Sequence, residues 1–202
     1  MEARYPSLKD KNIIVVGTGG IGGAIVKDFL EQDSRVFALD KEESVLKKLE
    51  SYASSDKNKK LITYQIDVLD YKKYEEILRK IGEDYKPIKS FVHTVGVGEA
   101  TPIGETPHEL SEYLFRLNVL SFINGVNTIQ EYMERGSSIT VISSINAYRS
   151  EHRMSVYDST KAALLQFART AAADLGAKGI RVNVVAPGYI NTPQTVEELK
   201  NP

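Results

Sequence analysis

The chain has 202 residues, with 26 Lys and Arg against 27 Asp and Glu, so its formal net charge is −1. This balance gives no reason to expect nucleic acid or a membrane as a partner, and no apolar run approaches the ~20 residues of a membrane span. The absence of cysteine excludes disulfides and thiolate chemistry, and three widely spaced histidines argue against a zinc site. The opening residues are too polar for a secretory signal. We therefore expect one cytoplasmic domain over residues 1–202.

Short β-branched runs alternate along the chain with longer segments of helical period. Strands are expected at residues 12–16, 35–39, 61–66, 88–94, 138–142 and 180–185, and helices at 20–31, 42–53, 71–84, 109–134 and 155–177. In the first helix, Ile21, Ile25, Phe29 and Leu30 form an apolar stripe. Alternating strands and helices predict right-handed crossovers and a three-layer α/β fold. The expected sheet is parallel and doubly wound, of Rossmann type, with strand order 3-2-1-4-5-6.

Glycines cluster between the first strand and the first helix. Five of the 14 glycines lie within residues 17–23, and Gly17, Gly19 and Gly22 form a GxGxxG pattern. Glycine there allows a tight turn, a close approach of the backbone to a pyrophosphate, and free N–H groups at a helix N-terminus. Asp40 ends the second strand, where an acid accepts the ribose hydroxyls of NAD and repels the 2′-phosphate of NADP. The pattern favours NAD over NADP. For the glycines, a simple turn that connects strand to helix remains an alternative. For the cofactor preference, a contact from Lys41 to the phosphate of NADP remains an alternative.

A second constellation combines Ser144, Tyr157 and Lys161. The YxxxK spacing occurs three times, but Pro6 and Pro87 interrupt the first two copies, so only Tyr157 and Lys161 share one face of an uninterrupted helix. A phenol has a pKa near 10, and a neighbouring ammonium lowers it toward neutrality. Ser144 ends the fifth strand, at the same sheet edge as the glycines. Together these residues indicate hydride transfer, although a surface pair beside a strand-end hydroxyl is the plainer alternative.

These motifs resemble those of the short-chain dehydrogenase/reductase family over nearly the whole chain. Further matches are Asp67-Val68 after the third strand, Gly96 after the fourth, Asn118 in the long middle helix, and the segment 181–188 that ends in Pro187-Gly188. The resemblance implies that Tyr157 is the acid/base, that Lys161 binds ribose and lowers the Tyr157 pKa, and that Ser144 orients the reacting oxygen. It also implies that Asn118 holds a water in a proton relay and that Ile190 and Thr192 meet the nicotinamide carboxamide.

The implied site contains two sets of residues. The catalytic set is Asn118, Ser144, Tyr157 and Lys161. The cofactor-binding set is Gly17, Thr18, Gly19, Gly20, Ile21, Gly22, Asp40, Asp67, Val68, Thr94, Gly96, Tyr157, Lys161, Pro187, Gly188, Ile190 and Thr192.

The sequence departs from the family pattern in three places. The glycine loop is one residue shorter than the usual TGxxxGxG, and His93-Thr94-Val95-Gly96 stands where the family has Asn-Asn-Ala-Gly. His93 is expected to be a hydrogen-bonded structural substitute. The family usually continues beyond the position of Thr192 with helices and a seventh strand, so we expect a sheet without that strand. Two explanations of the missing segment stay open: the sequence is a truncated form, or a partner chain covers the sixth strand.

The sequence therefore predicts an oxidoreductase that interconverts an alcohol and a carbonyl of a small molecule with NAD(H). The alternatives are a truncated dinucleotide-binding protein with little or no catalysis, and a structural fold without a dinucleotide. Arg149 and Arg153 lie between Ser144 and Tyr157, where they meet either an anionic substrate or solvent. The alanine-rich helix after Tyr157 packs either on the sheet or on a second copy. The resemblance implies a homodimer or homotetramer.

Overall fold

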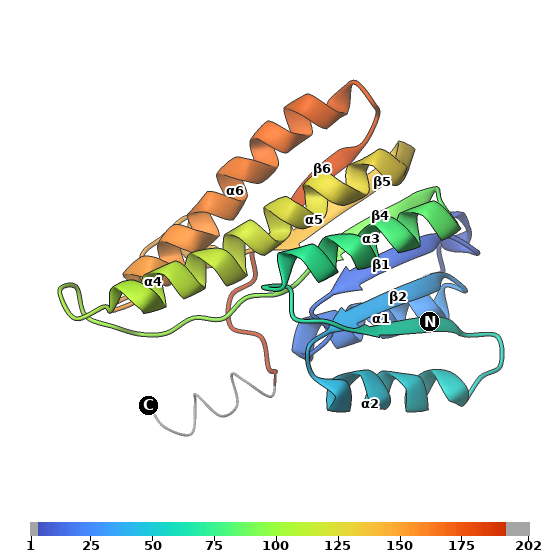
Figure 1. Ribbon diagram of the computed structural model, residues 1–202, viewed down its shortest axis with the longest axis horizontal. Coiled ribbons are helices and arrows are strands. Elements are labelled where there is room, and N and C mark those ends of the chain that lie inside the picture. Colours follow the sequence, from blue (N-terminus) through green and yellow to red (C-terminus); the bar gives the residue numbers. More distant parts are fainter. Residues whose placement is uncertain (1–3, 193–202) are drawn as a thin grey trace.

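The computed structural model describes residues 4–192 and contains one parallel six-stranded sheet of order β3-β2-β1-β4-β5-β6 (Figure 1). The strands are β1 (Asn12–Val16), β2 (Arg35–Asp40), β3 (Lys60–Gln65), β4 (Ile88–His93), β5 (Met133–Ile142) and β6 (Arg181–Val185). The α-helices are α1 (Gly20–Glu31), α2 (Glu43–Ser54), α3 (Tyr71–Tyr85), α4 (His108–Phe115), α5 (Ser121–Ile129) and α6 (Ser155–Gly176). The predicted strand order and doubly wound topology are confirmed.

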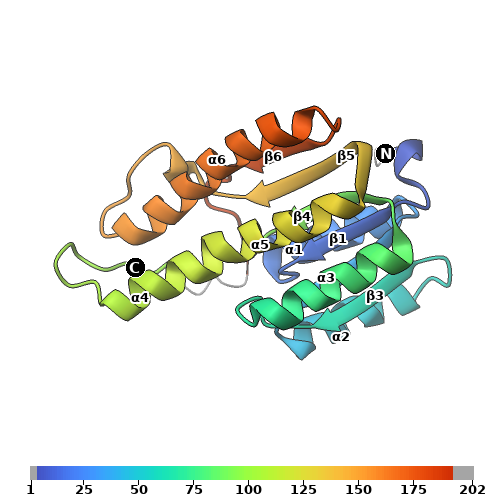
Figure 2. The ribbon, with the colours of Figure 1, turned by 45° about the horizontal axis from the view of Figure 1, so that its top comes forward.

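The two faces of β1 explain its continuous run of apolar residues. Ile14 and Val16 pack into the core beneath α3, α5 and α6, whereas Ile13 and Val15 pack against α1 and α2. All four side chains are fully buried. Because helices cover both faces of this strand, alternation of apolar and polar residues is lost. Figures 1 and 2 show the two helical layers with the sheet between them.

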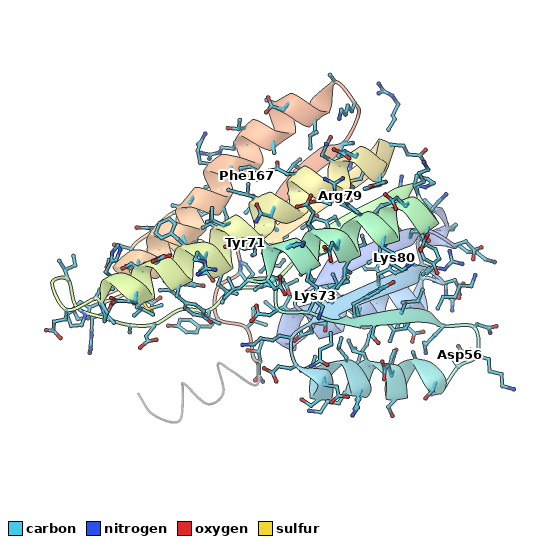
Figure 3. All side chains as sticks on the ribbon, in the orientation of Figure 1. Asp56, Tyr71, Lys73, Arg79, Lys80 and Phe167 are labelled. Carbon is cyan, nitrogen blue, oxygen red and sulfur yellow. The ribbon has the colours of Figure 1, made fainter. Side chains whose placement is uncertain are left out.

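The helical layer over β4 and β5 is more apolar inside than outside. Phe167 of α6 meets Phe122 of α5 edge to face, with ring centroids 5.6 Å apart. On the outer side of α3, Arg79 pairs with Glu75 and Glu131 at 2.8 and 3.3 Å. Figure 3 shows Phe167 beside α5 and Arg79 on the exposed side of α3. The contact between the two rings fixes α6, which carries Tyr157 and Lys161, against α5.

The helix predicted over residues 109–134 is present as one continuous helical segment from His108 to Tyr132, but it is not regular α-helix throughout. The segment divides into α4, a π-helical turn at Arg116–Leu120, α5 and a short 3-10 turn at Gln130–Tyr132. A π turn displaces backbone carbonyls from their usual partners, and here the Ser121 hydroxyl donates to the Leu117 carbonyl at 2.5 Å. β5 also begins earlier than expected, at Met133, because a register shift against β4 and the positive φ of Gly136 (87°) interrupt its alternation.

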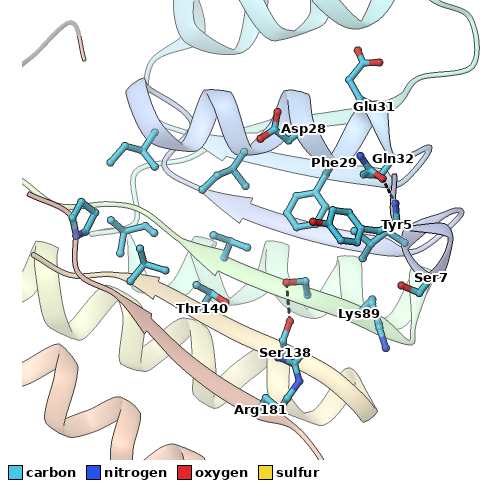
Figure 4. A pocket seen from close by; sticks show the side chains of 18 of the residues that line it. Tyr5, Ser7, Asp28, Phe29, Glu31, Gln32, Lys89, Ser138, Thr140 and Arg181 are labelled. Atoms are coloured by element: carbon cyan, nitrogen blue, oxygen red, sulfur yellow. Dashed lines mark hydrogen bonds between the residues drawn. The ribbon is translucent and has the colours of Figure 1, made fainter. Parts of the chain in front are cut away.

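The two halves of the sheet differ in how they are covered. Over residues 4–192, one face of β4, β5 and β6 borders a groove of about 1170 Å³ beside α1. Figure 4 shows Phe29 and Asp28 on the α1 side of this groove, with Thr140 and Arg181 on the strand side. The expected stripe of α1 is therefore only partly correct. Leu30 is buried together with Gly22 and Val26, whereas Ile21, Ile25 and Phe29 line the groove and stay half-buried.

β6 is an edge strand in the part of the chain that the structure describes, and no seventh strand pairs with it there. Among the same residues, no helix combines the length and the apolar character needed to cross a membrane. Nor does this part of the chain bring three His, Cys, Asp or Glu side chains together in a way that suits a metal ion.

Candidate active site

A cleft of about 980 Å³ lies along the carboxyl ends of the strands, where ligands of doubly wound sheets bind. Nearly all of the predicted site residues line it. They are Gly17, Gly19, Gly20, Ile21, Gly22, Asp40, Asp67, Val68, Thr94, Gly96, Ser144, Tyr157, Lys161, Pro187, Gly188, Ile190 and Thr192. The two predicted residues outside the lining are Thr18 and Asn118, and both are buried behind it. The structure thus gathers residues from seven separate segments at one edge of the sheet.

The glycine loop is folded so tightly that a side chain has no room at two of its positions. Gly17 has a φ of 80°, a conformation that favours glycine. A Cβ added to Gly22 would lie 1.9 Å from the Gly17 carbonyl oxygen. The Thr94 hydroxyl also donates to that oxygen. α1 begins at Gly20, so its unpaired N–H groups face the cleft beside these glycines. The loop therefore fits a pyrophosphate, because it offers donors and a bare backbone surface.

Asp40 braces the glycine loop in addition to lining the cleft. Its Oδ2 accepts from the Thr18 backbone N–H at 2.5 Å and from the Thr18 hydroxyl at 3.2 Å. Its Oδ1 accepts from the Glu42 N–H at 3.0 Å. Thr18, which was expected to contact the cofactor, is only 1 % exposed and instead faces this carboxylate. The cofactor contact of Thr18 stays a prediction, while its backbone N–H and its hydroxyl are both directed at Asp40.

Tyr157 and Lys161 lie one turn apart on α6. The Lys161 Nζ is 5.4 Å from the centroid of the Tyr157 ring and donates to the Ile142 carbonyl at 3.2 Å. The side chain is 4 % exposed, and burial lowers the pKa of Lys161 to about 8. Glycine makes room for both groups, because a Cβ at Gly96 would lie 2.8 Å from Nζ and one at Gly98 would lie 2.9 Å from the Tyr157 ring. Both side chains are thus packed against bare backbone.

Asn118 lies in the π turn and holds the segment that follows β4. Its Nδ2 donates to the Val97 carbonyl at 2.8 Å and to the Thr160 hydroxyl at 3.0 Å, and its Oδ1 accepts from the Val97 N–H at 3.0 Å. The side chain is fully buried. It therefore fixes the loop on which Tyr157 and Lys161 pack. A water in a proton relay at Asn118 stays a prediction.

His93, in place of the family's asparagine, is a buried structural residue as expected. Its Nε2 lies 3.2 Å from the Ser121 hydroxyl, whose own proton is directed to the Leu117 carbonyl. The Nε2 atom must therefore carry the imidazole proton. Burial, with the Lys161 charge as the smaller cause, lowers the pKa of His93 to about 3. The ring is neutral at physiological pH.

Several residues of the site were missed by sequence reasoning. Asn146 donates through its Nδ2 to Glu151 at 3.1 Å and to Asp158 at 2.7 Å. The Tyr189 hydroxyl donates to Glu151 at 2.8 Å. Gly98 and Met154 also line the cleft. No motif marks these residues. Asn146 and Met154 lie between Ser144 and Tyr157, where attention could have been drawn to them, whereas Gly98 and Tyr189 come from other segments.

The fold and this cleft define a Rossmann-type dinucleotide-dependent oxidoreductase. The family model of the short chain dehydrogenases matches residues 11–202, so the chain belongs to that family.

Individual proteins agree with this assignment. The chain is 29 % identical over 189 residues to a short-chain dehydrogenase/reductase, aba4, of Botryotinia fuckeliana. The match covers 91 % of this chain and 73 % of that protein. It is 28 % identical over 186 residues to a diacetyl reductase of Staphylococcus epidermidis, covering 90 % and 72 %. A solved structure of ElxO with NADP bound superimposes with a TM-score of 0.87 at 27 % identity, covering 95 % and 78 %.

Proposed function

We propose that this protein interconverts an alcohol and a carbonyl of a small molecule by hydride transfer with NAD(H). The single observation that carries the proposal is the placement of Ser144, Tyr157 and the buried Lys161 in the same cleft as the glycine loop. A bound dinucleotide supplies the hydride donor or acceptor at its nicotinamide ring. The glycine loop, Asp40, Asp67 and Val68 would hold its adenosine and pyrophosphate end. Pro187, Gly188, Ile190 and Thr192 would hold its nicotinamide end.

The proton chemistry belongs to this chain's own side chains. In the oxidation direction, the Tyr157 phenolate takes the hydroxyl proton of the alcohol, and in reduction the phenol returns it. The Lys161 ammonium favours the phenolate because a nearby positive charge lowers the pKa of a phenol. The Ser144 hydroxyl holds the reacting oxygen in place. A fixed geometry of this kind supplies much of the rate of a two-reactant step.

NAD is the proposed cofactor, with NADP the less favoured one. Asp40 ends β2 at the cleft and is held by the Thr18 and Glu42 backbone N–H groups, and an acid at this point of the motif repels the 2′-phosphate of NADP. The NADP bound to ElxO belongs to that protein. Because a similar protein binds NADP, the activity test of this chain uses both cofactors.

The test is carbonyl reduction by NADH and, separately, by NADPH with a panel of ketones and aldehydes that includes diacetyl. Tyr157→Phe removes only the phenolic oxygen, so kcat/KM should fall by about 10²–10⁴-fold, the usual contribution of a general acid. Tyr148→Phe is the matched control, since Tyr148 is 65 % exposed and lies outside the cleft lining. An unchanged rate in Tyr157→Phe would refute the mechanism.

Dinucleotide binding with little catalysis is the second candidate. Within residues 4–192, four side chains line both the cleft and the groove beside α1, so the two hollows adjoin there: Ile21, Ile142, Pro187 and Ile190. Water in the cleft weakens the electrostatic interactions on which catalysis depends. Calorimetric NAD binding without turnover on the whole panel would favour this function.

A homodimer or homotetramer is the proposed assembly. On α6, Ala168 and Ala171 are buried toward the sheet, whereas Ala162 and Ala173 are exposed. The small residues therefore pack against the sheet on the buried face of α6, and on its exposed face they leave a shallow surface on which a second copy could pack. Sedimentation equilibrium tests this, and a monomer at micromolar concentration would contradict it. The cytoplasmic location stays a prediction.

A further inference from the structure

One buried amide lies between the two halves of the proposed catalytic centre. Asn146 is 8 % exposed and belongs to the short 3-10 turn Ile145–Ala147 that follows Ser144. Its Nδ2 donates to Asp158 Oδ1 at 2.7 Å. Asp158 comes directly after Tyr157 in the first turn of α6. A single side chain therefore ties the end of β5, which carries Ser144, to the helix that carries Tyr157.

The same residue orients the Ser144 hydroxyl. The Asn146 backbone N–H donates to Ser144 Oγ at 3.2 Å. A serine hydroxyl has one proton and two acceptor lone pairs. Because one lone pair receives the Asn146 N–H, the proton of Ser144 stays available to donate to the oxygen of a substrate. Asn146 thus acts on both groups that must share that oxygen.

Two carboxylates hold Asn146 in this position. Its Nδ2 also donates to Glu151 Oε2 at 3.1 Å, and Asp158 Oδ2 accepts from the Glu151 backbone N–H at 2.9 Å. Hydrogen bonds to ionised acceptors are stronger than neutral ones. The Asn146 hydrogen bond, followed by that of Tyr189, lowers the pKa of Glu151, so this carboxylate stays ionised at neutral pH. We call Asn146, Glu151 and Asp158 the amide clamp.

The amide clamp also reaches the segment that follows β6. Glu151 Oε1 accepts from the Tyr189 hydroxyl at 2.8 Å. In the same segment, the Pro187 carbonyl accepts from the Ile145 N–H at 2.9 Å. The turn after β5, the start of α6 and the loop after β6 therefore form one hydrogen-bonded unit around the reacting groups.

We propose that Asn146 is a positioning residue of the reaction, which fixes the Ser144 hydroxyl relative to the Tyr157 phenol through the amide clamp. The inference rests on the proposed function, because only a shared substrate oxygen requires the two groups at one fixed separation. A displacement of about 1 Å costs an enzyme about 10²-fold in rate. Asn146 itself is not available as a donor to substrate, since both protons of its amide are engaged.

The test compares Asn146→Ala, Asn146→Asp and the exchange Asn146→Asp/Asp158→Asn, with Asn127→Ala on the exposed side of α5 as the control. Asn146→Asp brings three carboxylates together. The exchange restores an amide at position 158 that still offers an oxygen to the Glu151 N–H and a donor to position 146. The readouts are kcat and KM for the fastest carbonyl of the panel, and Kd for NADH from its fluorescence, which no Trp obscures in this chain.

Both single variants should lower kcat at least tenfold while the Kd for NADH stays within threefold of wild type. The exchange should recover kcat at least threefold over Asn146→Asp, and Asn127→Ala should match wild type. If Asn146→Ala does not fold, the comparison of Asn146→Asp with the exchange decides. An active wild type whose kcat survives in Asn146→Ala, or an exchange without recovery, overturns the amide clamp alone. A wild type that binds NADH but reduces no carbonyl overturns the proposed function as well.

Discussion

The cleft has two sides that are held in place in different ways. The cofactor side contains the glycine loop and Asp40, and the catalytic side contains Ser144, Tyr157 and Lys161. On the cofactor side, the critical feature is the absence of atoms, since Gly17 and Gly22 pack backbone against backbone where no Cβ fits. On the catalytic side, the critical feature is the presence of particular side chains, held by burial and hydrogen bonds around Tyr157 and Lys161. A substitution therefore damages the first side by adding volume and the second by removing a group or freeing its neighbours.

The two sides also differ in what they cost the fold. Two N–H groups of the glycine loop are paired with groups of β2, the Gly17 N–H with the Leu39 carbonyl at 2.8 Å and the Thr18 N–H with Asp40. Lys161 instead keeps a charge in a buried place with one carbonyl acceptor among its described contacts. A buried charge is unfavourable unless it is well paired. The catalytic side thus carries a stability cost that the cofactor side avoids.

The largest expected effect comes from filling the glycine loop. In Gly22→Ala, the new Cβ would lie 1.9 Å from the Gly17 carbonyl oxygen, and a backbone atom cannot rotate away. We expect a loss of about 3 kcal/mol in the free energy of unfolding and a loss of NAD affinity on the order of 10²-fold. Denaturant unfolding and NAD calorimetry measure the two effects.

Gly19→Ala is the matched control for that substitution. Gly19 has a φ of −66° and no heavy atom within 4 Å of an added Cβ. Because Gly19 is the N-cap of α1, where alanine is less favourable than glycine, the free energy of unfolding should fall by at most about 1 kcal/mol. Equal damage from the two substitutions would show that the loop is sensitive to any side chain, and the packing explanation would then be wrong.

Replacement of Lys161 should separate stability from activity on the catalytic side. Burial lowers its pKa from 10.5 to about 8, so the unfolded chain binds this proton more tightly than the folded chain. The resulting penalty is fully present below pH 8 and disappears as the pH rises from 8 to 10.5. At pH 7, Lys161→Met should therefore raise the free energy of unfolding by about 3 kcal/mol while it abolishes turnover.

The pH dependence gives the sharper measurement. The advantage of Lys161→Met over wild type in chemical denaturation should shrink between pH 8 and pH 10.5. Lys178→Met is the control, because Lys178 is exposed near the end of α6 and donates to Gln130 at 2.6 Å. It should change stability by less than about 0.5 kcal/mol at either pH. A Lys161→Met protein that is less stable than wild type at pH 7 would contradict the stability cost.

The parts of the structure that depend on local patterns were predictable from the sequence. Buried strands such as β1, the glycines that open α1, and the i, i+4 pair of Tyr157 and Lys161 are each determined within a few neighbouring residues. The order of the strands then follows from the handedness of the crossovers. These rules placed the cofactor side and the catalytic side at one edge of the sheet.

The parts that depend on contacts between distant segments were not predictable. The π turn around Asn118 is stabilised by Val97 and Thr160, which lie 21 and 42 residues away. Asn146 and Tyr189 both donate to Glu151, and none of the three belongs to a motif. Thr18 fills a position in a cofactor motif, yet its side chain turns toward Asp40. The periodicity of apolar residues does not predict such hydrogen-bond partners, because tertiary packing brings them together from distant segments.

The smallest expected effect concerns the charge that closes the cofactor side. Asp40→Asn keeps an oxygen for the Thr18 N–H, so the loop should hold its shape while the negative charge is lost. Because that charge repels a 2′-phosphate, the ratio of NADP to NAD affinity should rise about tenfold, or about 1.4 kcal/mol. Calorimetry with both cofactors measures this ratio.

Asp67→Asn provides the comparison within the same cleft. Asp67 lines the cleft and accepts from the Leu69 N–H at 2.9 Å, so the substitution also removes one negative charge without deleting a loop contact. If the charge acts by position, the affinity ratio in Asp67→Asn should stay within threefold of wild type. If both variants shift the ratio equally, the general negative potential of the cleft selects the cofactor. The charge of Asp40 would then act as one part of that potential, and its position beside the glycine loop would not determine which cofactor binds.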